Sequence, residues 1–196
     1  MDLLVFVGEV LSLKREEAIE LVRKYVSTQN LVKHMIAVGA IMKGFAAKLG
    51  EDPDVWEIVG ILHDIDYDIT KNNPKIHALE AEKILKGILD DELIEAIKKH
   101  NFENNGSGEP RKPIEIALIS ADALSGLIVA TALVMPNKKL EEVKVSSVLN
   151  KFKDKSFARR ISRERIKYCE KLGLTLEEAI EMALNAMKDV ASELGL

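Results

Sequence analysis

Residues 30–49 read NLVKHMIAVGAIMKGFAAKL, and the apolar side chains in this stretch recur every three or four positions. This spacing is typical of a helix with one buried face, because an α-helix has about 3.6 residues per turn. Gly50 follows directly and favours the end of the helix. The stretch therefore predicts a long core helix, and it places His34 on the buried face of that helix.

The same period continues over most of the 196 residues, whereas the alternation typical of strands is nearly absent. Asp52 and Pro53 suit the N-cap and first turn of a helix that runs to Leu62. The other predicted helices cover residues 14–26, 78–88, 93–97, 113–135, 143–152 and 175–190. Residues 66–74 and 101–113 are polar and contain Asn and Pro, so they are expected to form loops. The chain is therefore predicted to be all-α.

The composition excludes several classes of protein. Hydrophobic residues make up 47% of the chain and charged residues 31%, which is enough apolar surface to exclude disorder throughout. The formal net charge of −4 argues against a module that binds duplex nucleic acid, since such modules usually carry a basic excess. Cys169 is the single cysteine, so an intramolecular disulfide and a four-thiolate zinc site are both excluded; we expect it to be a buried, apolar side chain.

The N-terminal stretch, Met1–Leu11, has an acidic residue at position 2 and lacks the basic region that begins a signal peptide. No uninterrupted apolar stretch reaches the ~18–20 residues that span a bilayer. We therefore expect a cytoplasmic protein without a membrane partner, whose first segment packs on its own core or on another protein. The oligomeric state stays open, with a homo-oligomer among the options.

Histidine is the informative residue type in this chain. Each of the four histidines, His34, His63, His77 and His100, is spaced three, four or seven residues from apolar positions, which places them on the buried faces of four predicted helices. One such residue would be read as a hydrogen-bonded core histidine. Four together call for another explanation, and neutral imidazole is the commonest nitrogen ligand of metal ions in proteins.

Two carboxylates complete the predicted site. Asp64 follows His63 directly, and Asp122 lies within the apolar stretch ALISADALSGLIVA at residues 117–130. A buried Asp is costly unless it is paired or bound to a cation, although a role in capping or bending the helix is the alternative for Asp122. Neighbouring residues on a helix point about 100° apart, so His63 and Asp64 share one cation only near a helix end, which the polar residues after Asp66 provide. We predict that His34, His63, Asp64 and Asp122 bind one divalent cation at about 2.0–2.3 Å.

This order of a His, a His-Asp doublet and a distant Asp on helices resembles the HD superfamily of metal-dependent phosphohydrolases. The matching motifs are KHMIAVGAIMKGFAAKLG at 33–50, GILHDIDYD at 60–68 and ISADALSG at 119–126. The resemblance covers roughly residues 28–135 and implies an all-α HD-domain helical bundle. In HDIG-type members additional histidines bind a second metal, and His77 and His100 stand at similar places. The turn around Asp90 is expected to bring these two histidines to the same end of neighbouring helices.

Two departures from the family pattern bear on the substrate. Asp66 and Tyr67 stand where many HDIG members have Gly-Lys after the doublet, so the lysine is missing. Residues 106–110 read GSGEP and do not match the Gly-Tyr-Pro element of cyclic-dinucleotide phosphodiesterases. Both departures argue against cleavage of a cyclic dinucleotide.

We divide the chain into an N-terminal helical segment (1–27), an HD metal-binding core (28–136) and a C-terminal helical extension of the same domain (137–196).

The resemblance implies hydrolysis of a phosphomonoester or phosphodiester, in a small nucleotide-like substrate, with Asp64 and His63 as the catalytic residues. It also implies one or two divalent ions, of Mn, Fe, Co, Ni, Zn or Mg. With two ions, His77 and His100 hold the second and Asp64 bridges the pair; with one, both histidines contact substrate phosphate or a water. Alternative functions are a di-iron HD-type oxygenase and a non-catalytic, metal-containing nucleotide sensor.

A basic stretch lies between residues 151 and 165. It contains Lys151, Lys153, Lys155, Arg159, Arg160, Arg163 and Arg165. A solvated face is the simpler reading of such a run of charge. The sharper hypothesis is that Arg159 or Arg160 reaches the metal site and binds substrate phosphate, because a guanidinium matches the geometry of phosphate oxygens. Asp66 and Asp68 are candidates for capping the loop or supporting the metal ligands, and Glu80, one turn after His77, is the candidate for orienting His77.

Overall fold

The structure is a computed structural model that describes residues 13–196, so the prediction for Met1–Leu11 lies outside the described residues. The described chain is helical and holds no strand, which confirms the all-α prediction. The α-helices are α1 (Arg15–Tyr25), α2 (Gln29–Leu49), α3 (Pro53–Leu62), α4 (Tyr67–Thr70), α5 (Leu79–Leu85), α6 (Asp91–Lys99), α7 (Phe102–Asn105), α8 (Pro113–Leu133), α9 (Val145–Lys153), α10 (Arg163–Ile166), α11 (Leu176–Asp189) and α12 (Ala191–Leu194). Two 3₁₀ segments, η1 (Leu140–Glu142) and η2 (Lys167–Leu172), complete the fold.

The end of α2 and the start of α3 lie where local signals place them. α2 ends at Gly50, which has a φ of 76° that a residue without a Cβ adopts at little cost. Asp52 then caps α3, because its side chain accepts hydrogen bonds from the backbone N–H groups of Asp54 and Val55. The expected core helix and the expected N-cap are both confirmed, and together they fix the sharp turn that folds α3 back onto α2.

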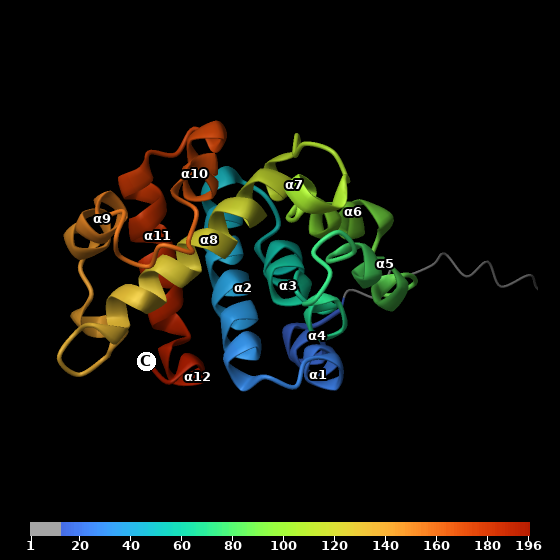
Figure 1. Cartoon of the computed structure of the whole chain (residues 1–196), viewed down its shortest axis with the longest axis horizontal. Helices are drawn as coiled ribbons and strands as arrows, with labels where there is room; N and C mark the ends of the chain where they lie inside the picture. Colours follow the sequence, from blue (N-terminus) through green and yellow to red (C-terminus); the bar gives the residue numbers. More distant parts are fainter. Residues whose placement is uncertain (1–12) are drawn as a thin grey trace, which may run out of the picture.

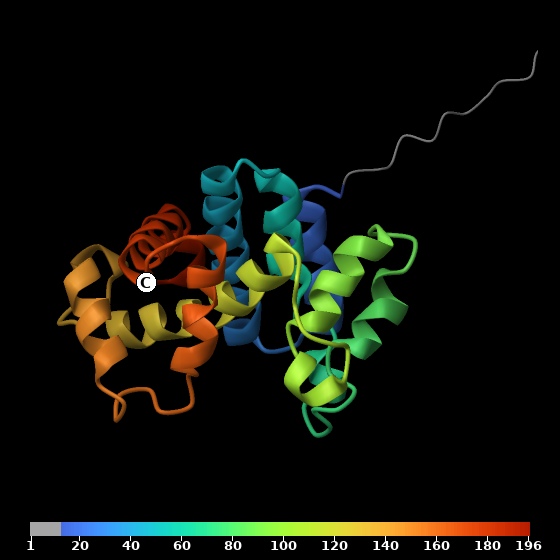
Figure 2. The same ribbon diagram turned by 90° about the horizontal axis from the view of Figure 1, so that it is seen from above.

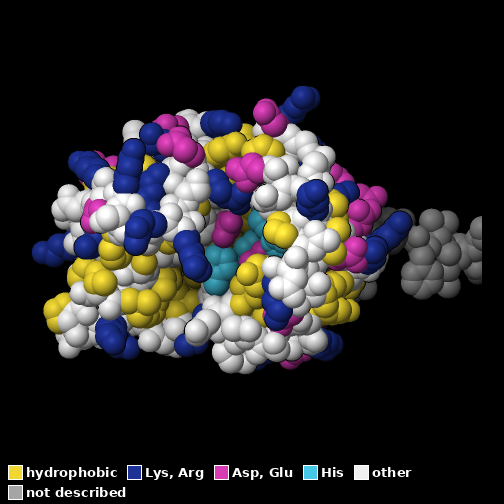
Figure 3. Space-filling view, viewed as in Figure 1, with side chains coloured by type: hydrophobic (Ala, Val, Ile, Leu, Met, Phe, Trp, Pro, Cys, Tyr) yellow, Lys and Arg dark blue, Asp and Glu magenta, His cyan; other side chains and the backbone are white. Residues whose placement is uncertain are grey.

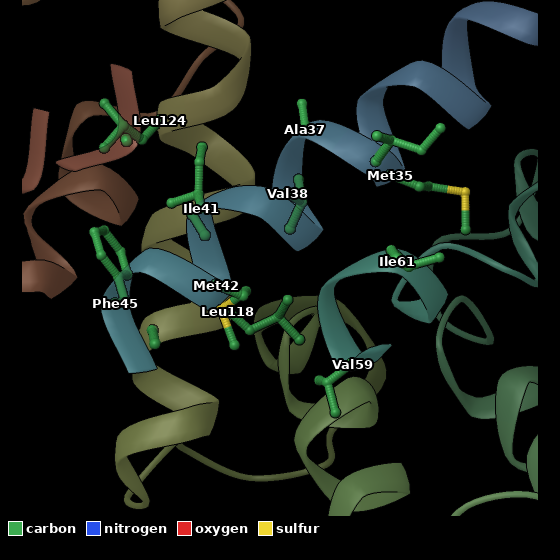
Figure 4. Packing of buried hydrophobic residues seen from close by; sticks show 14 of the residues in the cluster. Met35, Ala37, Val38, Ile41, Met42, Phe45, Val59, Ile61, Leu118 and Leu124 are labelled. Carbon is green, nitrogen blue, oxygen red and sulfur yellow. The ribbon is translucent and has the colours of Figure 1, made fainter. Parts of the chain in front are cut away.

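The core lies where α2, α3 and α8 cross. Figure 4 shows Met42 and Phe45 of α2 among the side chains that fill this region, with Val59 of α3 and Leu118 and Leu124 of α8 nearby. All five are fully buried. In Figure 1, α8 runs diagonally across α2, with α9–α11 on one side and α5–α7 on the other; Figure 2 shows the same division from above.

Helix α8 is long and apolar enough to cross a membrane by length and composition alone. However, 72% of its most apolar 18-residue window is buried inside the protein. It packs against α2, α3 and α6, and on its other side against α9, α10 and η2. Its apolar character is therefore that of a central core helix, which joins the predicted HD core to the C-terminal extension.

Three sequence-based expectations need correction. Residues 66–74 and 101–113 are not wholly irregular, because each contains a helical turn, α4 and α7 respectively. The helix expected over residues 78–88 covers only Leu79–Leu85, since Gly87 has a φ of 80° that ends it. Ala78 also has a positive φ of 70°, so the chain before α5 is not helical. His77 thus precedes its helix instead of lying on it.

The start of α8 is stabilised by the buried carboxylate of Glu115. It accepts hydrogen bonds from the backbone N–H groups of Arg111 and Lys112, at 2.7 and 3.0 Å, and from Lys99 Nζ at 3.0 Å. Burial alone would raise the pKa of Glu115, but these donors outweigh it and hold the pKa below its ordinary value.

We expect Glu115→Gln to destabilise the protein at neutral pH by about 1–2 kcal/mol, since the amide cannot replace all three charge-assisted bonds. A depressed carboxylate pKa stabilises the fold above the unfolded-state value of 4.5 and loses this effect as the pH falls through the folded-state pKa. Urea unfolding should therefore separate the variant from the wild type at pH 7, and the difference should shrink in acid. The exposed Glu16→Gln is the control, and an equal loss of stability there would contradict the prediction.

Candidate metal centre

The structure brings the four predicted ligands of one cation to a common point. His34 Nε2 lies 3.2 Å from Asp122 Oδ1 and 3.9 Å from Asp64 Oδ2. His63 Nε2 lies 3.5 Å from Asp64 Oδ2 and 4.0 Å from Asp122 Oδ1. Ligand atoms that share a cation at about 2.0–2.3 Å are themselves about 3–4 Å apart, so this set matches one divalent ion. We call it the first ligand set.

A second ligand set forms on the other oxygen of Asp64. His77 Nε2 lies 3.1 Å and His100 Nε2 3.3 Å from Asp64 Oδ1, and the two nitrogens are 3.2 Å apart. The two carboxylate oxygens of Asp64 thus face different histidines. A carboxylate in this position is suited to bridge two cations about 3.5–4 Å apart.

All four imidazoles are oriented in the same way. Each Nδ1 has a hydrogen-bond acceptor beside it, which leaves Nε2 to face Asp64 or Asp122. The acceptors are Gly60 O for His63 (2.8 Å), Ile97 O for His100 (2.6 Å), Ser125 Oγ for His34 (3.1 Å) and Asp66 Oδ1 for His77 (3.0 Å). When Nδ1 carries the proton, Nε2 presents a lone pair, which is the form that binds metal.

His63 shows that the donor set suits a cation. Its side chain is fully buried, and its Nε2 is a buried side-chain atom without a hydrogen-bond partner among residues 13–196. Burial lowers the pKa of His63 to about 4, so the ring is neutral at pH 7. A buried nitrogen with a free lone pair costs free energy unless something binds it, and a divalent cation between His63 and the two carboxylates does so.

The remaining members carry the charges that a cation needs. Burial favours the protonated form of Asp64 and Asp122, but the neighbouring histidines outweigh it and hold both pKa values below the ordinary range. Burial also lowers the pKa of His77, yet hydrogen bonds to Asp64 and Asp66 raise it to about 9. The carboxylates are therefore anionic at pH 7, and a cation bound by the second set would take the place of the proton on His77 Nε2.

Helix ends make this convergence possible. His34 lies within α2 and Asp122 within α8, but His63 and His100 are the C-cap residues of α3 and α6. His63 and His100 are thus buried as expected but stand at helix ends, and His77 precedes α5. Where a helix ends, the chain turns, and this turn allows His63 and the next residue to reach the same centre.

The centre is accessible from one side. Figure 3 shows histidine side chains at the bottom of a hollow, next to acidic side chains and with Lys and Arg on the rim. The side chains of His34 and Asp122 are 26% and 25% exposed, whereas that of His63 is 0% exposed. The His63 side is therefore closed by the core, and a substrate has access over His34 and Asp122.

The basic stretch contributes a different arginine from those predicted. Arg159 and Arg160 are exposed, and within the described part of the chain neither has a hydrogen bond or ion pair to the metal centre. Arg163 donates to six main-chain carbonyl oxygens between residues 151 and 161, so it closes a loop. Arg165 donates from Nη2 to Asp122 Oδ2 at 3.2 Å.

His77 is oriented by Asp66 and not by Glu80, the residue proposed for this role. Asp66 is fully buried and accepts the hydrogen bond from His77 Nδ1, while its other oxygen accepts the backbone N–H of Ala81 at 3.2 Å. Glu80 instead pairs with Lys83, its neighbour on α5. Asp66 is therefore the side chain that holds the ring of His77 in place.

Comparison with known proteins gives the family. A family model described as "HD domain" matches residues 31–127. Ribonuclease Y of Clostridium botulinum is 32% identical over 172 residues, which are 85% of this chain and 32% of that protein. Ribonuclease Y of Staphylococcus epidermidis is 35% identical over 101 residues, which are 50% of this chain and 18% of that protein. The chain thus spans at most about a third of the length of these relatives, and no solved structure matches it. From these matches and the ligand sets, we conclude that the chain belongs to the HD superfamily of metal-dependent phosphohydrolases, with residues 31–127 as its HD domain.

Proposed function

We propose that this protein hydrolyses a phosphodiester bond in a small nucleotide substrate and uses two divalent cations. The observation that carries the proposal is the placement of the two oxygens of Asp64, each facing its own set of imidazole Nε2 atoms. The relatives named ribonuclease Y support a diester of ribonucleotides over a monoester.

Two divalent cations would stabilise the negative charge that develops on the phosphoryl oxygens and lower the pKa of a water molecule to about 7. The residues of the chain position these groups. Asp64 sets the spacing between the two ligand sets. Ser125 keeps the Nε2 of His34 directed inward, because its hydroxyl donates to Asp122 O at 2.8 Å and so accepts from His34 Nδ1. His63 and the core behind it exclude water from the closed side.

Two ions per chain are expected when the metal-free protein is titrated with Mn²⁺ by calorimetry. Of the two oxygens of Asp64, His77 faces Oδ1, in the second ligand set, so His77→Ala should lower the stoichiometry to one and leave the first ligand set intact. Anomalous diffraction from crystals soaked in Mn²⁺ provides an independent count. A single ion in the wild type under excess Mn²⁺, unchanged in His77→Ala, would defeat the two-cation proposal.

The proposed activity is tested by metal analysis of protein purified without chelator, followed by hydrolysis assays with Mn²⁺, Co²⁺, Mg²⁺ and Ni²⁺. The substrates are bis-p-nitrophenyl phosphate as a diester, p-nitrophenyl phosphate as a monoester, and a short single-stranded RNA. We expect cleavage of the diester and the RNA. Iron-loaded protein that consumes O₂ without hydrolysing any phosphoester would support the oxygenase instead, and tight nucleotide binding without turnover would support a sensor.

A further inference from the structure

Arg165 contacts residues of both ligand sets, although it belongs to the C-terminal extension and lies outside the HD domain. Its Nη2 donates to Asp122 Oδ2 at 3.2 Å and to the carbonyl oxygen of His100 at 2.7 Å. Its Nη1 donates to Glu103 Oε2 at 2.6 Å. One guanidinium therefore contacts a residue of the first ligand set and the backbone of a residue of the second.

The backbone around Arg165 is held firmly against α8. Ser162 caps α10, and its hydroxyl accepts the backbone N–H of Arg165 at 3.2 Å. The next residue, Ile166, is fully buried, and its carbonyl oxygen accepts a hydrogen bond from Ser120 Oγ at 2.8 Å. Ser120 lies two residues before Asp122 on α8. The guanidinium is thus delivered from a fixed point close to the carboxylate that it contacts.

The contact with Asp122 determines which way its carboxylate faces. Oδ1 lies 3.2 Å from His34 Nε2, in the first ligand set, while Oδ2 receives the hydrogen bond from Arg165. A carboxylate can rotate about its Cβ–Cγ bond, so it loses orientation when one oxygen has no partner. Arg165 supplies that partner. The bond to the carbonyl of His100 likewise holds the end of α6, from which the imidazole of His100 extends.

Arg165 is poorly suited to bind substrate phosphate directly. Three acceptors already occupy its terminal nitrogens, and its side chain is only 17% exposed. It therefore acts on the metal centre through Asp122 and His100.

We propose that Arg165 is a positioning residue of the metal centre, by which the C-terminal extension completes a site whose ligands all lie in the HD domain. This inference rests on the proposed metal-dependent function, but it concerns cation binding and not the identity of the substrate. It predicts that the HD domain ligands alone hold a cation less tightly than the full chain does.

The test uses the full chain and two readouts that need no turnover: calorimetry with Mn²⁺ and the visible absorption spectrum of the Co²⁺-loaded protein. We expect Arg165→Met to weaken the tighter Mn²⁺ site by about 10–100-fold and to change the Co²⁺ spectrum, because the orientation of Asp122 is lost. The Mn²⁺ affinity of Arg165→Lys should lie between those of the wild type and Arg165→Met, since an ammonium group reaches fewer of the three acceptors. Arg160→Met, an exposed position in the same segment, is the matched control and should bind both metals like the wild type.

A double-mutant cycle separates positioning from a general loss of structure. In an Asp122→Asn background, Arg165→Met should weaken Mn²⁺ binding further by less than about 2-fold, because its partner is already altered. Glu103→Ala, which removes only the outer contact of the guanidinium, keeps the test open if Arg165→Met folds poorly: it should weaken the tighter Mn²⁺ site, and an unchanged affinity would count against the inference. A wild-type Mn²⁺ affinity and Co²⁺ spectrum in folded Arg165→Met would overturn this inference alone. Metal binding that depends on Arg165, without hydrolysis of any phosphodiester, would overturn only the proposed activity.

Discussion

Asp64→Asn is expected to reduce phosphodiester hydrolysis by about 1000-fold or more, which corresponds to about 4 kcal/mol of transition-state stabilisation. Asp64 faces both ligand sets, with Oδ2 near His63 and Oδ1 near His77 and His100. An amide has one oxygen, carries no charge and places an N–H₂ group where the other oxygen stood. Both cations would therefore lose a shared anionic ligand through a change of a single atom.

The same substitution should leave the fold intact, because Asn has nearly the shape of Asp and no apolar contact is removed. Circular dichroism, the thermal midpoint and hydrolysis of bis-p-nitrophenyl phosphate are measured on one preparation. Asp54→Asn is the matched control: it lies on α3, the helix that ends at His63, and its side chain is 84% exposed. Full activity in Asp64→Asn, or an equal loss in Asp54→Asn, would refute the assignment of Asp64.

The sequence predicted the parts of the fold that depend on neighbouring residues. The end of α2 follows from Gly50, and the start of α3 follows from Asp52 and Pro53. Each of these signals acts within one turn of its helix. The helix predicted over residues 175–190 is likewise present as α11, and a capping box of Thr175 and Glu178 begins it.

The positions of the histidines could be predicted in part. The order of His34, His63, Asp64 and Asp122 indicated a common centre, and the structure brings these side chains together. The exact place of His77 could not be predicted, because the positive φ of Ala78 interrupts a sequence that otherwise has helical spacing. That interruption allows His77 Nδ1 to reach Asp66 and Nε2 to reach Asp64.

The role of Arg165 could not be predicted because its contacts join residues far apart in the sequence. Arg165 is 43 residues from Asp122 and 62 from Glu103. In the sequence it is one basic residue among seven, and nothing local distinguishes a guanidinium that reaches the centre from one that closes a loop, as Arg163 does. Such a distinction depends on how α10 packs on α8, which is a property of the folded chain.

Gly60→Ala is expected to destabilise the protein by about 3 kcal/mol, because it would place a methyl group inside the closest contact between two helices. A Cβ at Gly60 would lie 2.7 Å from Gly39 Cα and 2.8 Å from Gly39 N, and backbone atoms cannot move aside as a flexible side chain does. Helices α2 and α3 would have to separate. Gly44→Ala on α2 is the control, since its Cβ would meet Ala186 Cβ at an ordinary 3.6 Å, and alanine favours a helix by about 0.5–1 kcal/mol over glycine.

The separation of α2 and α3 should also weaken metal binding, and this links the packing to the chemistry. These two helices carry His34 and His63, whose ring centroids are 5.2 Å apart, and the carbonyl of Gly60 accepts the hydrogen bond from His63 Nδ1. Urea unfolding gives the loss of stability, and Mn²⁺ calorimetry under conditions where the variant is still folded gives the loss of affinity. If Gly60→Ala loses stability but binds Mn²⁺ like the wild type, the centre tolerates a change in helix spacing. If both fall while Gly44→Ala retains both, the close crossing of α2 and α3 is what holds the first ligand set at the distance that one cation requires.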